Sequence, residues 1–287
     1  MMGNGSLHLL RIVSILLPMA LCVAPSMQAQ TTDIPMEHNG WGRFALGAWK
    51  HAKITTRSYD KEGKLANTTT TSEHVTLTGV SRGYATLRIE TLLEVGGKSF
   101  ESPVRTVSQG YHGEQIGYRT TMRELGEGKT TVDGKPISCR VRQYVIMANG
   151  QKKLVRVHYS SRVAPYVLQR ETETTIRNAP RPTYHTVAQV VALDRPHKVL
   201  DETKTTSHLK IVKQNGKSAT TTLAVHARDV PGEVVSYTSE ERDSDGKLIR
   251  HSTMELVDYG YSTPSEQLQF TRRRDWKKYK RRSRRGR

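Results

Sequence analysis

Glycine turns recur along this chain, and five of them share a residue-Gly-Lys pattern. They are Glu62-Gly63-Lys64, Gly96-Gly97-Lys98, Asp133-Gly134-Lys135, Asn215-Gly216-Lys217 and Asp245-Gly246-Lys247, and Asn149-Gly150 is a sixth turn of the same kind. Tight hairpin turns need backbone with positive φ, which glycine adopts without steric cost. The chain is therefore predicted to fold back on itself repeatedly, in antiparallel hairpins.

Segments rich in Thr, Val, Arg and Tyr flank these turns, and the Thr, Val and Tyr among them favour strands. The expected strands cover residues 49–59, 65–78, 84–90, 141–147, 154–159, 209–212, 219–226, 234–242 and 248–257. Helical periodicity is scarce, so parallel βαβ units are not expected. We predict a mainly β protein with few helices: a single antiparallel curved sheet, as a half-barrel or open barrel, built from hairpins. Residues 180–182, Pro-Arg-Pro, are interpreted as a loop between two sub-sheets.

Two pairs of segments are similar within the chain. Residues 60–65 parallel residues 243–248, and residues 162–167 parallel residues 228–235. Either duplicated halves or repeated use of one turn type explains this similarity. Repeated use is the more economical interpretation, because hairpin geometry alone favours it.

The first 29 residues are predicted to be an export signal peptide. Arg11 closes a short polar start, residues 12–23 are apolar, and small residues precede a cleavage position after Ala29. An uncleaved anchor is the alternative, but this apolar stretch is shorter than the roughly 20 residues that span a bilayer. We expect an exported protein, periplasmic or extracellular. Removal of the signal leaves Cys139 as the only cysteine, and we expect it to be a buried small hydrophobe rather than a nucleophile.

The remaining chain is divided into a polar lead (30–40), a β-rich domain (41–271) and a basic tail (272–287). The net charge is +18, and the tail holds eleven Lys or Arg against one acid, Asp275. Such a charge density predicts a disordered segment. The tail residues expected to bind an anionic partner are Arg272, Arg273, Arg274, Trp276, Lys277, Lys278, Tyr279, Lys280, Arg281, Arg282, Arg284, Arg285 and Arg287. Export separates the protein from most nucleic acid, so envelope lipid or acidic polysaccharide is the expected partner.

Four segments together carry a resemblance to known proteins. They are residues 47–50 (Gly-Ala-Trp-Lys), 132–141 with Cys139, 157–167 with its Tyr-Ser-Ser run, and 252–259. The chain resembles uncharacterised exported proteins of planctomycete-type bacteria, and is distantly similar to periplasmic lipoprotein and lipid carriers of the LolA/LppX type. The resemblance covers roughly residues 41 to 260. It implies an antiparallel sheet curved into a half-barrel around an apolar cavity closed by helices, and an apolar or acylated ligand.

Candidate catalytic and metal-binding patterns are weak. Residues 79–83 match the Gly-x-Ser-x-Gly pattern of hydrolases, which would make Ser81 a nucleophile, but that chemistry needs a strand, a strained turn and a helix. A strand follows here, so a plain hairpin is favoured. The histidines are scattered, although strand pairing could bring His158 and His226 together. No metal, cofactor or catalytic residue is assigned, and we expect the protein not to be an enzyme.

These observations predict a non-enzymatic exported β-rich protein that binds a component of the cell envelope, with a polybasic tail attracted to anionic surfaces. The first alternative is a LolA/LppX-like carrier that holds an apolar or acylated ligand in the concavity of the sheet. The second alternative is an esterase that uses Ser81.

Overall fold

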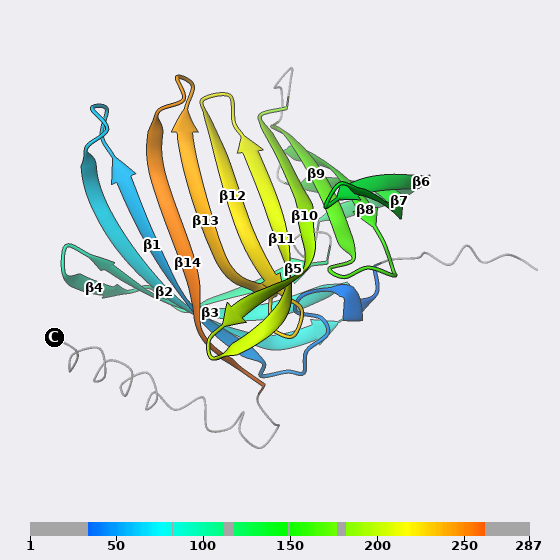
Figure 1. Ribbon diagram of the computed structural model, residues 1–287, viewed down its shortest axis with the longest axis horizontal. Helices are drawn as coiled ribbons and strands as arrows, with labels where there is room; N and C mark the ends of the chain where they lie inside the picture. The colour runs from blue at the N-terminus through cyan, green and yellow to red at the C-terminus, as the bar shows by residue number, and fades with distance from the viewer. Residues whose placement is uncertain (1–33, 82, 112–117, 149, 177–181, 262–287) are drawn as a thin grey trace, which may run out of the picture. The chain divides into compact units, whose positions relative to one another are not determined.

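The computed structural model describes residues 34–81, 83–111, 118–148, 150–176 and 182–261. These residues form one 3-10 turn and fourteen strands (Figure 1). In chain order the elements are η1 (Met36–His38), β1 (Trp49–Tyr59), β2 (Leu65–Ser81), β3 (Tyr84–Val95), β4 (Lys98–Glu101), β5 (Arg105–Gly110), β6 (Arg119–Val132), β7 (Lys135–Ala148), β8 (Gln151–Tyr159), β9 (Val167–Ile176), β10 (Tyr184–Val199), β11 (Glu202–Gln214), β12 (Ser218–Ala227), β13 (Val234–Asp243) and β14 (Leu248–Gly260). The helices implied by the resemblance to carriers are not found among the described residues.

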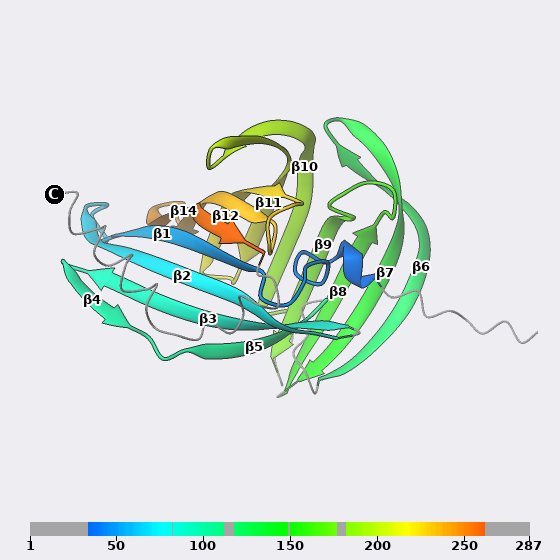
Figure 2. The ribbon, with the colours of Figure 1, turned by 90° about the horizontal axis from the view of Figure 1, so that it is seen from below.

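All fourteen strands belong to one antiparallel sheet, which confirms the predicted fold class. The order is β4-β3-β2-β1-β14-β13-β12-β11-β10-β9-β8-β7-β6, and β5 also pairs with β3. The strands curve, and the sheet stays open, with β6 at one edge and β4 and β5 at the other (Figures 1 and 2). The proposed boundary between two sub-sheets at residues 180–182 is wrong, because β9 and β10 pair directly across that loop.

The path of the chain through the sheet has one long step. Strands β1 to β5 run outward to one edge, whereas β6 starts at the opposite edge and β6 to β14 return towards the middle. There β14 pairs with β1, so that Ile54 lies between Met254 on one side and Thr71 on the other. The pairing of β1 with β14 therefore joins the two ends of the described chain.

The predicted glycine turns are confirmed. Gly63, Gly97, Gly134, Gly150, Gly216 and Gly246 all have φ between +73° and +82°. The turns after β1 and β13 are alike in detail. Asp60 Oδ1 accepts the N–H groups of residues 62 and 64 at 3.0 and 2.8 Å, and Asp243 Oδ1 accepts those of residues 245 and 247 at 3.0 and 2.9 Å.

The loops after β8 and β12 also share one structure. Ser160 N–H donates to the Tyr166 carbonyl at 2.8 Å, and Ala227 N–H donates to the Glu233 carbonyl at 2.8 Å. Tyr166 and Glu233 both have positive φ, of 69° and 62°. Equivalent residues are 67 positions apart in these loops (160 to 227) and 183 apart in the turns (60 to 243). Because the spacings differ, repeated use of favourable turns explains the internal similarity better than one duplication of halves.

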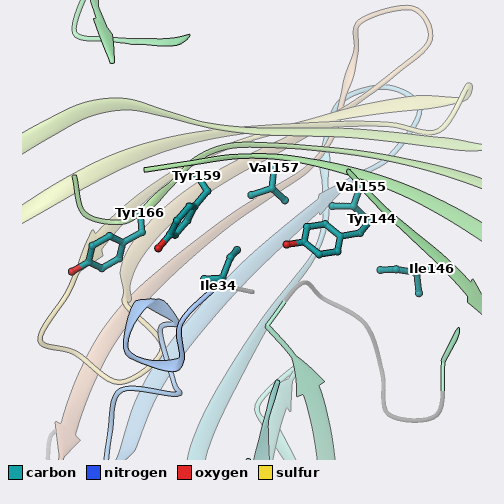
Figure 3. Close-up of a cluster of buried hydrophobic side chains, with 7 residues drawn as sticks. All are labelled: Ile34, Tyr144, Ile146, Val155, Val157, Tyr159 and Tyr166. Carbon is teal, nitrogen blue, oxygen red and sulfur yellow. The ribbon is translucent and has the colours of Figure 1, made fainter. Parts of the chain in front are cut away.

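The core of the described chain is divided among several buried clusters along the sheet. The one drawn in Figure 3 contains Ile34, Tyr144, Ile146, Val155, Val157, Tyr159 and Tyr166. Ile34, from the expected polar lead, is 5 % exposed and packs against side chains of β7 and β8. A second cluster surrounds Leu77 and Leu87 and is contacted by Trp41 and Phe44. Residues 34–48 therefore cover part of the sheet.

The same N-terminal segment connects the two similar loops. His38 stacks on Tyr166, with ring centroids 3.7 Å apart, and its Nδ1 lies 2.6 Å from the Tyr159 hydroxyl. Arg43 forms an ion pair of 2.5 Å with Glu233 and donates to the Arg228 carbonyl at 3.0 Å. One short segment thus fixes the loops after β8 and β12.

Candidate ligand-binding groove

Strands β1, β2 and β11 to β14 form a groove of about 660 Å³ on one face of the sheet. We call this the inner face and define it by Ile54, Met254, Tyr237 and Ala224, which occupy consecutive positions in register on β1, β14, β13 and β12. Successive residues of a strand point to opposite faces, so each strand contributes alternate residues to the groove. Six strands that are far apart in the sequence build one surface in this way.

The middle of the groove is apolar on one side and hydroxyl-bearing on the other. Its apolar side chains are Ala52, Ile54, Val75, Ile211, Ala224, Val234 and Met254. Beside them, Thr56 lies 3.0 Å from Ser252 and Thr222 lies 2.8 Å from Ser239, oxygen to oxygen. Ser252 and Ser239 are themselves paired in register. Thr222, Ser239 and Ser252 line the groove, and because their hydroxyls bond to neighbours across strands they do not require a polar ligand.

Ionisable side chains gather at one end of the groove. Lys50, Glu73 and His226 line it there, and Tyr237 lies nearer the middle, in register with Met254 and Ile54. Burial lowers the pKa of Lys50 to about 8, against the opposing effect of Glu73 and Glu233. Its Nζ donates to the Val234 carbonyl at 3.5 Å, a long hydrogen bond. Burial, and the nearby charge of Glu73, raise the pKa of Tyr237. This end therefore contains an ammonium group that is poorly compensated by its surroundings.

The other end of the groove is more exposed and of mixed charge. Arg250 and Glu241 form an ion pair at 3.3 Å, and the Ser218 hydroxyl donates to Glu241 at 3.0 Å. Lys213 extends over the Tyr184 ring, 5.7 Å from its centroid. A middle of apolar and hydroxyl-bearing side chains between two charged ends suits an elongated amphipathic molecule.

Ser81 lies in a hairpin, as expected from the strand that follows it. It ends β2 and pairs with Tyr84, the first residue of β3, so the strand–turn–helix geometry of a hydrolase nucleophile does not occur there. Its Oγ is buried and has no hydrogen-bond partner in the described part of the chain. No described base or acid thus contacts the predicted esterase nucleophile.

Strand pairing does not bring His158 and His226 together. His158 is on β8 and His226 on β12, with three strands between them. His158 instead lies 2.9 Å from the Thr130 hydroxyl and 3.8 Å from the sulfur of Cys139, and burial lowers its pKa. Cys139 is buried, as expected.

A group of metal-ligating side chains lies across β9 and β10. Glu171, Glu173 and His185 offer atoms within 4.8 Å of one another. Arg156 donates to Glu171 at 3.0 Å, and His185 lies 3.0 Å from the other oxygen of that carboxylate. Because Glu171 is already paired with a cation, we assign this group to ion pairing at the surface.

The predicted signal (1–29) and the predicted basic tail (272–287) lie outside the described residues. The groove residues were not singled out from the sequence. The alternate residues Lys50, Ala52 and Ile54 indicate that one face of β1 is partly apolar. The sequence does not reveal which other strands complete the inner face. Among the described residues, no helix has the length and apolar character needed to cross a bilayer.

Comparison with known proteins gives little further information. No family model matches the chain, and no curated protein matches it. One similar solved structure is a protein of Bacteroides fragilis described as exported and as having a YmcC-like fold, with 7 % identity and a TM-score of 0.26 over 75 % of this chain and 100 % of that one. Another is OmpF of Salmonella typhi in complex with daunomycin, with 8 % identity and a TM-score of 0.20 over 78 % of this chain and 98 % of that one. At these TM-scores neither likeness supports a statement about function.

Proposed function

We propose that this chain is a non-enzymatic exported protein that binds an amphipathic component of the cell envelope in the inner groove. The observation that carries the proposal is the groove itself, a hollow of about 660 Å³ whose apolar side chains lie beside hydroxyl groups and between two charged ends. Ligand pockets are usually hollows of this size, mainly apolar, with a few polar groups that orient the ligand. A carrier that holds an acylated ligand against the concave face fits the same geometry.

A bulky side chain in the middle of the groove tests this proposal. Thr222 lines the groove, whereas its neighbour Leu223 is 56 % exposed on the opposite face. We expect Thr222→Trp to weaken binding of the fluorescent fatty acid cis-parinaric acid about tenfold or more, because the indole fills the space that the ligand needs. Leu223→Trp is the matched control and should bind like the wild type. Equal affinities of the wild type and both variants would exclude the groove as the site.

The basic tail is proposed to hold the protein near anionic surfaces. Each Lys or Arg close to an anionic bilayer contributes on the order of 1 kcal/mol, and the contribution falls with salt. We expect removal of residues 272–287 to lower partitioning onto phosphatidylglycerol vesicles at least tenfold at low salt, with no change on phosphatidylcholine vesicles. Co-sedimentation over a salt series measures this, and an unchanged salt dependence after truncation would disprove the role of the tail.

A further inference from the structure

Arg142, on β7, is a buried cation without a counter-ion. It is 2 % exposed, and its Nε and Nη1 atoms have no hydrogen-bond partner. Among the described residues it forms no ion pair; its guanidinium lies over the ring of Tyr159, 4.9 Å from the ring centroid. The middle of β7 thus holds two donor nitrogens, Nε and Nη1, that have no acceptor.

This arrangement is costly in the absence of an anion. Arginine stays protonated in proteins, so it does not escape the cost of burial by losing its proton. A cation–π contact with one tyrosine offsets only part of the cost of removing an ion from water. The unpaired N–H groups therefore point to an oxyanion that completes the site.

The surroundings of Arg142 define what that oxyanion is attached to. Val157 lies opposite it in register on β8, and Tyr144, Ile146 and Val155 pack in the same cluster, all almost fully buried (Figure 3). A small hydrated anion would lose its water here among side chains that are mainly apolar. An anion attached to an apolar body gains hydrophobic contacts at the same time.

Arg142 also lies on the face that carries the groove. Residues directly opposite each other on paired strands share a face of the sheet. Arg142 pairs with residue 157, which pairs with 170, which pairs with 188, and no bulge interrupts these pairs. Residue 188 pairs in turn with Ile211, and Ile211 pairs with Thr222. Ile211 and Thr222 line the groove. The unpaired guanidinium and the apolar groove are thus parts of one continuous inner face, four strand steps apart, or about 19 Å along the sheet.

We propose that Arg142 binds the oxyanion head, a carboxylate or a phosphate monoester, of a long-chain amphiphile whose apolar part extends along the inner face. This inference rests on the proposed function and adds the chemical class of the ligand. Arg142 is the residue that distinguishes a charged head from a neutral one.

The test compares ligands that share one chain and differ in the head. Oleate, oleyl phosphate and oleyl alcohol are titrated against wild type, Arg142→Met and Arg140→Met, with displacement of N-phenyl-1-naphthylamine as the signal. Arg140, the matched control, is on the same strand but exposed, and lies 3.7 Å from Glu124. We expect Arg142→Met to weaken oleate and oleyl phosphate about tenfold or more and to leave oleyl alcohol unchanged. Whichever of the two anions loses more affinity identifies the natural head.

Thermal unfolding of the ligand-free protein supplies an independent readout. Replacing an unpaired buried cation with an apolar residue of similar length should leave the melting temperature of Arg142→Met equal to or above that of the wild type. A purely structural arginine would give the opposite, a lower melting temperature with unchanged preference for the anionic heads. That result would overturn the inference. The inference would also be overturned if Lys50→Met lost the preference for anionic over neutral heads while Arg142→Met kept it.

The remaining outcomes separate this inference from the proposed function. If neither the anions nor oleyl alcohol displace the probe from the wild type, the proposed function fails together with the inference. If all three ligands bind the wild type equally, only the inference fails. Should Arg142→Met not fold, Arg142→Lys is used: a several-fold loss of oleate affinity with unchanged oleyl alcohol supports the inference, and unchanged oleate affinity contradicts it.

Discussion

Replacing Arg43 with methionine should lower the free energy of unfolding by about 3–5 kcal/mol, as expected when one partner of a buried ion pair is removed. The side chains of Arg43 and Glu233 are only 10 % and 13 % exposed, and they approach to 2.5 Å. Without the guanidinium, the Glu233 carboxylate stays buried and the Arg228 carbonyl loses a donor. The N-terminal segment would then lose one of its anchors on the loop after β12, while the hydrogen bond from Gly232 N–H to the Gly40 carbonyl remains.

Chemical denaturation at pH 7 measures this effect. Arg88→Met is the matched control, because Arg88 pairs with Glu90 at 2.6 Å but is 41 % exposed. It should cost no more than about 1 kcal/mol, as for exposed pairs. The double variant Arg43→Met with Glu233→Gln should recover part of the loss, since no unpaired carboxylate remains. A loss below about 1 kcal/mol in Arg43→Met would show that the segment is not anchored by this pair.

Replacing Lys50 with methionine should stabilise the ligand-free protein by about 1–3 kcal/mol at pH 7. Burial lowers the pKa of Lys50 from 10.5 to about 8. The unfolded chain therefore binds more protons than the folded one between these two values, and stability of the wild type should rise with pH across that window. Below pH 8 the whole cost of the buried ammonium is present. The variant should lack both this cost and this pH dependence.

Unfolding curves from pH 7 to 10.5 for wild type, Lys50→Met and Lys53→Met test the prediction. Lys53 is the matched control, because it is exposed on the same strand. Glu73 and Glu233, the carboxylates whose charges act on Lys50, are present in all three proteins, so the difference between curves isolates the amine. Parallel pH profiles for wild type and Lys50→Met would show that Lys50 is not strained by burial.

Local features of this fold could be predicted from the sequence, whereas its long-range pairing could not. Each hairpin depends on a few adjacent residues, as in the turns after Asp60 and Asp243, where a carboxylate accepts two backbone N–H groups and glycine supplies the positive φ. The pairing of β1 with β14 joins residues about 200 positions apart. No turn signal specifies that contact, and for the same reason the step from β5 to the far edge at β6 was not anticipated.

The candidate site was the least predictable part, for a related reason. Thr and Ser occur on both faces of these strands, so alternation does not show which face is inner. Only the register across six strands brings Lys50 and Tyr237 into one groove and places Ile54 beside Met254. The burial of Arg142 also depends on residues that are distant in the sequence. It could not be predicted, because β7 resembles in composition other strands whose arginines are exposed. The basic tail is visible in the sequence, and its binding to anionic partners remains a prediction.

Native mass spectrometry of the protein purified from its own host, without detergent, tests the central claim most directly. We expect the wild type and Leu223→Trp to carry an additional mass corresponding to one amphipathic molecule, released by organic extraction, and Thr222→Trp to carry much less. A wild-type protein that is consistently free of bound molecules would contradict the assignment of the inner groove as a ligand site.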